Sequence, residues 1–390
     1  MQKNEVFALV DRQQEELFDM ACQIYDHPEC RGKEFFAAEL LTKALGKAGF
    51  AVEMGVGGQE TAFRATWSQG EGGPNIGLLG EYDALEALGH GCGHHMQTPA
   101  AIGAAVAVRD ALAGTDLPFT ITVYGTPAEE TYGGKILMAE QGCFRELDIA
   151  LGTHACREKA FVGGSSLALN SYRVIFKGRS AHASGVPWEG RSAGDAMFLS
   201  FNGIEYMREH VKDGTRMHYS VREDMGPSNV VPDRAVGGYS IRSRDNAYLK
   251  ELDSRFRKII QGACLMTETE AELIQQPSFA ARKRNYVLSD VARNNLKLLG
   301  VPIQEEIIRD SGGSTDFGNV SSIVPGILVY LPYVSTASHS AEWVAAGKTE
   351  DALSCTMNSA KALAGMLYDL ITDPSLIEKA KAEFDKKVKE

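Results

Sequence analysis

Six side chains that could take part in metal-dependent hydrolysis lie in four short segments of the chain. The segments are GHGCGHH, GTPAEE, LGTHAC and STASHSAEW, and the side chains are Cys92, His94, Glu129, Glu130, His154 and His339. Thiolate, imidazole and carboxylate groups are ligands that zinc prefers in proteins. Hydrolysis also needs a base that is not itself a ligand, and two adjacent glutamates can supply one of each. The pattern indicates a metallohydrolase site in which Glu129 accepts a proton from the attacking water.

Each of these segments also has an ordinary structural interpretation. A Cys-x-His pair alone is weak evidence for a metal, and adjacent glutamates can be solvated acids at the start of a helix. A histidine in an apolar strand is usually a satisfied buried side chain, and one in a Ser/Thr-rich loop usually lies on the surface. The segments gain weight together because each follows a predicted strand, and open α/β sheets place their sites outside the carboxyl ends of strands.

Two further histidines lie beside the Cys92 segment. His90 and His95 could be surface side chains, but we expect them to form hydrogen bonds that support the site. Their individual roles, and that of Glu81 in GEYDAL, are left open by the sequence.

The length and composition describe a large globular protein. A chain of 390 residues exceeds one ordinary core, so we expect two domains. A net charge of −11 without a basic stripe argues against a nucleic-acid-binding protein. No apolar run reaches membrane-spanning length. Seven cysteines without paired spacing, and an N-terminal segment without a secretory apolar core, favour a cytoplasmic protein.

The first and last parts of the chain alternate helix and strand patterns. Apolar side chains at helical spacing predict helices over 13–25 and 34–48, and Thr98 and Pro99 are placed as the N-cap and first residue of an Ala-rich helix. Four short apolar runs predict strands, at 75–82, 119–125, 148–154 and 326–332. Their lack of polar alternation is typical of strands covered on both faces, as in an α/β sheet.

The segment over 170–283 shows a different order of elements. Its patterns predict a strand, a helix, two strands, a helix and a strand, which is the β-α-β-β-α-β order of a ferredoxin-like unit. We therefore predict an α/β protein with a discontinuous first domain, formed by 1–169 and 284–390, and an inserted domain over 170–283.

Characteristic stretches occur in order along almost the whole chain. They include DHPECRGKE (26–34), GEYDAL (80–85), GHGCGH (89–94), GTPAEETYGGK (125–135), FKGRSAHAS (176–184), SNVVPD (228–233), GGSTDFGNVS (312–321) and HSAEW (339–343). In this series the chain resembles peptidase family M20, in the amidohydrolase branch that includes aminoacylases and hydrolases of indole-acetyl amino acids and p-aminobenzoyl-glutamate. The resemblance implies a mixed-sheet, di-metal exopeptidase-like catalytic domain with an inserted ferredoxin-like lid and dimerisation domain.

The resemblance also implies roles for the residues of the metal site. It implies that two divalent metal ions bind to five ligands, which are Cys92, His94, Glu130, His154 and His339. Glu129 would be the general base. Zinc suits these ligands best, and manganese or cobalt would also fit them.

Further roles are implied in the inserted domain and beside the substrate. His182 in GRSAHAS would stabilise the oxyanion, reaching the site of the partner subunit. Asn229 and Arg242 would bind a substrate carboxylate, for which the planar fork of arginine is suited. Gly313 belongs to the glycine-rich loop beside the substrate, where Asp316 would have a supporting role. The implied assembly is a homodimer, or a hetero-oligomer with a related subunit.

The expected reaction is hydrolysis of the amide bond of an N-acyl or aromatic-acyl amino acid, such as p-aminobenzoyl-glutamate. Alternatives are a dipeptidase, a metal-dependent deaminase of an aromatic amine and, outside enzymes, a silent metal-binding partner subunit. Two residues depart from the family pattern. His95 stands where many relatives have Asp or Asn, and Glu81 stands where relatives carry Asp.

Overall fold

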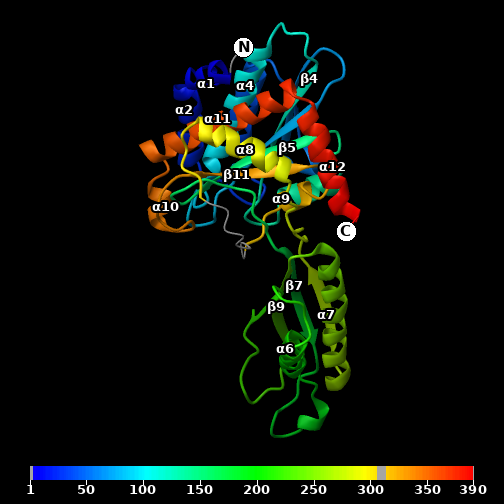
Figure 1. The fold of residues 1–390 in the computed structure, drawn as a ribbon. Helices are drawn as coiled ribbons and strands as arrows, with labels where there is room; N and C mark the ends of the chain where they lie inside the picture. The colour runs from blue at the N-terminus through cyan, green and yellow to red at the C-terminus, as the bar shows by residue number, and fades with distance from the viewer. Residues whose placement is uncertain (1–2, 305–312, 390) are drawn as a thin grey trace. The chain divides into compact units, whose positions relative to one another are not determined.

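The computed structural model describes residues 3–304 and 313–389, and these form two compact units (Figure 1). The first unit holds the described residues up to Ser165, those from Arg282, and those from Thr315 onward. The second holds Ser166–Ala281 together with residues 313–314. The sequence-based limits of the inserted domain were 170 and 283.

The first unit is built on a seven-stranded mixed sheet in the order β1-β2-β4-β3-β5-β11-β6. The strands are β1 (Ala51–Met54), β2 (Phe63–Gln69), β3 (Asn75–Gly80), β4 (Phe119–Gly125), β5 (Ile149–Cys156), β6 (Phe161–Val162) and β11 (Gly326–Pro332). β4, β3, β5 and β11 run parallel, whereas β2 and β6 pair antiparallel to their neighbours. The mixed α/β sheet expected from the sequence is therefore confirmed, and β3, β4, β5 and β11 match the four predicted strands.

Helices cover both faces of this sheet (Figure 1). They are α1 (Lys3–Asp11), α2 (Gln14–Asp26), α3 (Phe35–Lys47), α4 (Gln97–Leu112), α5 (Gly134–Glu140), α8 (Tyr286–Leu298), α9 (Phe317–Val320), α10 (Ala341–Ala345), α11 (Glu350–Thr372) and α12 (Ser375–Lys389). Successive strand residues point to opposite faces. Leu78 thus packs in the core with α4 and α11, whereas Leu79 packs in the smaller core with α5 and α9.

The start of α4 differs from the sequence-based expectation. Thr98 was placed as the N-cap, but α4 begins at Gln97, directly after the short 3-10 helix η2 (His94–Met96). Thr98 is buried inside the first turn, and its hydroxyl donates a hydrogen bond to the backbone oxygen of Glu81 at 3.1 Å. The prediction was wrong because the preceding 3-10 turn continues into the helix and takes over the role of a capping residue.

The second unit has the predicted order of elements. It consists of β7 (Ala168–Lys177), the 3-10 helix η3 (Pro187–Glu189), α6 (Ala193–Arg208), β8 (Arg216–Val221), β9 (Arg234–Ser243), α7 (Asn246–Thr267) and β10 (Glu270–Gln275). Its four strands form an antiparallel sheet in the order β10-β7-β9-β8, which is the ferredoxin-like arrangement. α6 and α7 pack on this sheet around Met197, Ile204, Leu252 and Phe256. Across the described residues, no helix combines the length and apolar character needed to span a membrane.

Candidate metal centre

The parallel strands of the first unit bring the candidate ligands to one edge of the sheet. Cys92 and His94 lie in the connection from β3 to α4, and Glu129 and Glu130 lie in the turn after β4. His154 lies within β5, two residues before the strand ends, and His339 lies in a turn between β11 and α10. Because parallel strands end at the same edge, residues far apart in the sequence converge there.

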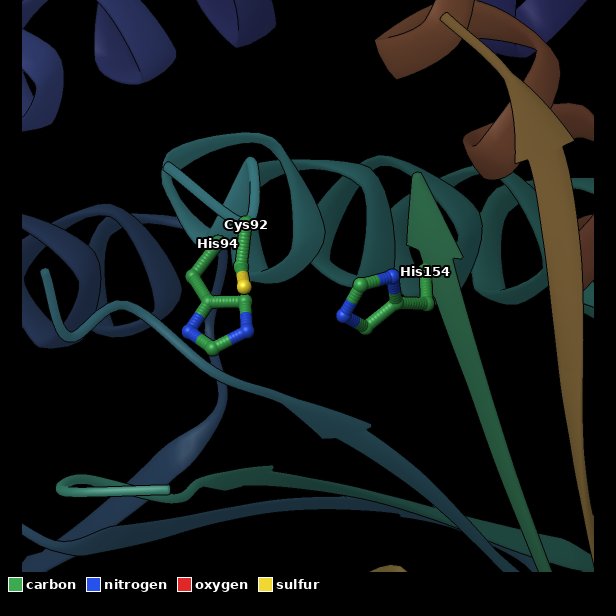
Figure 2. A group of neighbouring side chains, drawn as sticks. All are labelled: Cys92, His94 and His154. Carbon is green, nitrogen blue, oxygen red and sulfur yellow. The ribbon is translucent and has the colours of Figure 1, made fainter. Parts of the chain in front are cut away.

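The potential ligand atoms of these residues form three overlapping groups, each with all its atoms within 4.8 Å of one another. The groups are Cys92 with His94 and His154, Cys92 with Glu130 and His339, and His94 with Glu129 and Glu130. Figure 2 shows the first group, in which the two loop side chains and the strand side chain point toward a common space. Within the second group, Cys92 Sγ lies 2.7 Å from His339 Nε2, which is 3.7 Å from Glu130 Oε1.

The chemistry of this cluster fits a divalent cation. Glu130 Oε1 is buried and forms no hydrogen bond with any part of the chain that the structure describes, and the buried His94 Nε2 lies 3.0 Å from Glu81 Oε2. Buried polar atoms are almost always satisfied, so an unsatisfied carboxylate oxygen within a cluster of sulfur, nitrogen and oxygen atoms suggests a missing partner of positive charge. A zinc-type ion would accept these donor types together.

Two of the imidazoles are oriented by hydrogen bonds through Nδ1. His94 Nδ1–H donates to Asp83 Oδ1 at 3.0 Å, and His154 Nδ1–H donates to the backbone oxygen of Ala155 at 2.7 Å. The second oxygen of Asp83 accepts the backbone N–H of Glu130 at 2.9 Å. Asp83 therefore supports two candidate ligands at once, a role that its position in GEYDAL, in the loop after β3, could have signalled.

The cluster gathers several buried carboxylates, and their burial and mutual repulsion shift the pKa values of its members. Burial, followed by the carboxylate of Glu130, raises the pKa of the Cys92 thiol far above its ordinary range. Burial, followed by the charges of Glu81 and Asp316, also raises the pKa of Glu129 well above its ordinary value. Burial lowers the pKa of His94, but Glu81 and Asp83 outweigh that effect and hold it well above normal. Bound cations would relieve this repulsion, because positive charge favours the thiolate and carboxylate forms.

A buried ion-pair network adjoins Glu129. The Lys135 ammonium group donates to Glu81 Oε1 at 2.6 Å and to Asp316 Oδ1 at 2.7 Å, and all three side chains are buried. Burial lowers the pKa of Lys135, but Asp316 and Glu81 outweigh it and raise that pKa overall. Sequence reasoning left Glu81 open, placed Asp316 beside the substrate loop and gave Lys135 no role. Its place at the end of the stretch GTPAEETYGGK and at the start of an apolar helix could have signalled it.

His90 and His95 are both buried, so the alternative of surface histidines is wrong. His90 Nε2–H donates to the backbone oxygen of Ile24 at 3.1 Å, and His95 Nε2–H donates to that of Gly347 at 3.0 Å. Neither bond reaches a candidate ligand. Both imidazoles instead tie the ligand-bearing loop to α2 and to the segment after α10.

In the second unit, the residues of interest form two local groups. Ala183 N–H donates to the backbone oxygen of Asn229 at 2.9 Å, which sets the His182 segment beside the Asn229 segment. His182 Nδ1 accepts the backbone N–H groups of Ser184 and Gly185 at 3.3 and 3.1 Å. Since Nδ1 is an acceptor, the proton of a neutral His182 ring lies on Nε2.

The other group gathers around β9. Arg242 Nη1 donates to Ser314 Oγ at 2.8 Å, and the backbone oxygen of the neighbouring Gly313 accepts the N–H of Leu167 at 3.1 Å. Burial lowers the pKa of Arg242, although a guanidinium remains charged at neutral pH. The GGSTD loop begins at residue 312, which lies outside the described residues.

Comparisons with known proteins agree with this architecture. A model of Peptidase family M20/M25/M40 matches residues 77–365. One of the subunits of the p-aminobenzoyl-glutamate hydrolase of Escherichia coli is 32% identical, with 94% of this chain and 91% of that protein aligned. A Xaa-Arg dipeptidase of Mus musculus is also 32% identical, with 98% of this chain and 91% of that protein aligned.

The fold is also similar to that of solved structures. The YXEP protein of Bacillus subtilis, described as a dinuclear metal-binding peptidase from the M20 family, superposes with a TM-score of 0.69 at 19% identity. The superposition covers 92% of this chain and 99% of that protein. At this level of identity the likeness concerns the fold.

Proposed function

The chain belongs to peptidase family M20/M25/M40, whose members hydrolyse amide bonds, and from this premise we propose that it is a di-metal amidohydrolase acting on an N-acyl amino acid. The observation that carries this proposal is that two adjacent carboxylates, Glu129 and Glu130, have different neighbours. Both carboxylates are grouped with His94, but only Glu130 is also grouped with Cys92 and His339, and only Glu129 is also grouped with Glu81 and Asp316.

Two divalent cations, held by Cys92, His94, Glu130, His154 and His339, would polarise the substrate carbonyl and acidify water when bound. Glu129 then accepts the proton of the attacking water and returns it to the departing amine. This role requires a carboxylate that is close to the ligands without being consumed as one. The different further neighbours of Glu129 and Glu130 support that assignment.

We assign the oxyanion-stabilising hydrogen bond to His182. The two backbone N–H groups at its Nδ1 favour the tautomer with a proton on Nε2, which can donate to a developing negative charge. We assign recognition of a substrate carboxylate to Arg242 and Asn229, with Gly313 beside the substrate. The guanidinium of Arg242 is held from one side by Ser314, and the planar fork of an arginine can bind a carboxylate through two N–H groups at once.

Two relatives support two different substrate classes. The likeness to the p-aminobenzoyl-glutamate hydrolase chain supports an aromatic-acyl amino acid, and we favour this class. The equal identity to a Xaa-Arg dipeptidase supports a dipeptidase as the second candidate. Both substrates carry a free carboxylate beside the scissile amide. Assays of amino-acid and ammonia release with p-aminobenzoyl-glutamate, other N-acyl amino acids and Xaa-Arg dipeptides separate the two and also test for deamination.

The substitution Glu129→Gln tests the mechanism. We expect kcat to fall by roughly 10²–10⁴-fold, because an amide cannot accept the proton, while the bound metal per chain stays unchanged. Glu130→Gln is the matched control, and it should lower metal content because a ligand is lost. A Glu129→Gln enzyme with wild-type kcat would remove Glu129 from the mechanism.

A further inference from the structure

Lys135 is a charged side chain that the proposed mechanism does not use, although it is almost completely buried beside the general base. It is 1% exposed, and its two carboxylate partners, Glu81 and Asp316, are 3% and 0% exposed. Such a charge is costly to bury unless it is fully paired. The presence of a buried lysine at this position therefore needs an explanation, and the side chains around it suggest one.

The surroundings are a group of three carboxylates. Oxygen atoms of Glu81, Glu129 and Asp316 lie within 4.8 Å of one another, which is a spacing that could hold a cation. All three donors are carboxylate oxygens, and such a set favours hard cations such as Mg²⁺, Mn²⁺ or Ca²⁺. The Lys135 ammonium lies within hydrogen-bond distance of two of the three.

We propose that Lys135 is a positioning residue whose ammonium group takes the place of a metal ion among Glu81, Asp316 and Glu129, and so keeps Glu129 free to act as the base. This inference rests on the proposed function, because it assumes that the neighbouring centre holds metal and that Glu129 transfers protons. An ammonium group on a fixed stem satisfies two carboxylates without binding the third. A divalent ion at the same point would draw in all three and convert the base into a ligand.

The contacts of the two partners show how firmly this internal cation is held. Asp316 Oδ2 also accepts the backbone N–H of Lys135 at 3.0 Å, so Lys135 donates hydrogen bonds to both oxygens of Asp316. The other oxygen of Glu81 accepts a hydrogen bond from Gln97 Nε2 at 2.8 Å and lies 3.0 Å from His94 Nε2. Both carboxylates are thereby fixed at one orientation. Glu129 receives no hydrogen bond of this kind from the part of the chain that the structure describes, which leaves its carboxylate available for water.

Three substitutions separate charge from volume. Lys135→Ala removes both and opens space at a group of three carboxylates. Lys135→Met removes the charge but fills the space, and Lys135→Arg keeps a positive charge in a similar volume. Each variant is first loaded with zinc to fill the proposed centre and is then titrated with Mn²⁺, with both metals counted per chain by mass spectrometry.

We expect Lys135→Ala to bind one more Mn²⁺ per chain than the wild type, and we expect Lys135→Met and Lys135→Arg to bind none beyond the wild type. Adding Mn²⁺ to Lys135→Ala should lower kcat by about 10²-fold with little change in KM, because Glu129 becomes a ligand. Lys135→Arg should recover most of the wild-type kcat. The double variant Lys135→Ala/Asp316→Asn should lose the additional ion, and recovery of folded Lys135→Ala only in Mn²⁺-containing medium would also support the proposal.

Folded Lys135→Ala that binds no additional ion would overturn the inference, as would Lys135→Met with the wild-type kcat. Its failure can be told apart from failure of the proposed function. If Glu129→Gln were fully active, the base assignment would fall, yet the additional ion in Lys135→Ala would still identify Lys135 as an internal cation. If Glu129→Gln were inactive and no additional ion bound, Lys135 would be a structural ion pair only.

Discussion

At the scale of single residues, Asp83 forms hydrogen bonds with two candidate metal ligands, His94 and Glu130. One of its oxygens accepts from the imidazole of His94, and the other accepts the backbone N–H of Glu130. A carboxylate that orients an imidazole ligand fixes both the tautomer and the ring direction, and it makes the free nitrogen more basic. Asp83 is thus expected to control metal affinity without touching the metal.

The substitution Asp83→Asn tests this role. An asparagine must point its NH₂ group at either the His94 Nδ1–H or the Glu130 N–H. Both are hydrogen-bond donors, so one of the two hydrogen bonds is lost. We expect metal affinity to fall by about 10–100-fold, measured by competition with a chelator. Asp110→Asn, at a half-exposed position in α4, is the control and should leave affinity unchanged. Unchanged affinity in Asp83→Asn would show that the two hydrogen bonds do not support the ligands.

Glu34 is a buried carboxylate outside the metal cluster, and it gives a prediction about pH. Burial is the largest cause that raises its pKa above the ordinary 4.5, although hydrogen bonds from the backbone and from Thr61 oppose the shift. The folded protein therefore holds this proton more tightly than the unfolded chain does. Its contribution to stability is present below about pH 4.5 and is lost as the pH rises through the folded-state pKa.

Comparison of the wild type with Glu34→Gln isolates this effect, because other titrations are common to both proteins. The variant stays neutral at every pH. We expect the free energy of unfolding of the wild type, relative to that of the variant, to decrease as pH rises above about 4.5, as measured by urea denaturation. A difference that increases with pH would mean that the folded-state pKa is lowered instead.

At the scale of elements, the connection from β3 to α4 must deliver two candidate ligands just before the helix begins. Gly93 stands between Cys92 and His94 with φ of 79°, in the left-handed region that favours glycine. A Cβ atom there would lie 2.8 Å from Met96 Cε and 3.1 Å from Ala155 Cβ. The turn therefore depends on glycine both for its backbone conformation and for its close packing.

We expect Gly93→Ala to lower the free energy of unfolding by about 1–2 kcal/mol from the backbone conformation alone, and to reduce metal content by displacing both neighbouring ligands. Thermal unfolding and metal analysis measure the two effects. Gly262→Ala is the matched control, because Gly262 lies in α7 and its added Cβ meets no atom within 4 Å. That change should stabilise the protein by about 0.4–1 kcal/mol. Equal behaviour of the two variants would contradict the argument.

The elements also show why some features could be predicted from the sequence and others could not. β3, β4, β5 and β11 are short apolar runs bounded by polar loops, and this local pattern is enough to place the candidate ligands at one sheet edge. The hairpin of β1 with β2 escaped prediction, and the burial pattern of β1 gives the reason, since all four of its residues are exposed. β1 is defined by its pairing with β2, because its own sequence lacks the apolar pattern of a buried strand.

The buried network was missed for a different reason. Lys135 is 54 residues from Glu81 and 181 residues from Asp316, and no local pattern links them. A lysine at the start of a helix is ordinarily a solvated side chain. Only the folded sheet, which brings the ends of β3 and β4 beside the segment before α9, turns these three residues into a unit.

At the scale of the whole molecule, the exposed edge of the second unit bears on the expected assembly. Its sheet ends at β8 on one side and at β10 on the other, and an unpaired edge is a template for pairing with another chain. β10 carries Glu270 and Glu272, charges of the kind that discourage such pairing. β8 carries one charged residue, Arg216, and exposes Tyr219 and Val221, which are 38% and 48% exposed. These features favour β8 as the edge through which two copies associate.

We therefore predict that the protein is a homodimer and that Val221→Lys converts it into monomers, because a lysine in place of an exposed apolar side chain discourages pairing at a sheet edge. Ile274→Lys is the matched control, since Ile274 lies on the other edge, in β10, with 37% exposure, and this variant should remain dimeric. Light scattering coupled to gel filtration gives the mass of each. The competing expectation is a hetero-oligomer with a related chain. A wild-type protein that is monomeric and inactive until a second, related chain is added would favour that assembly, whereas a monomer that is active alone would contradict both.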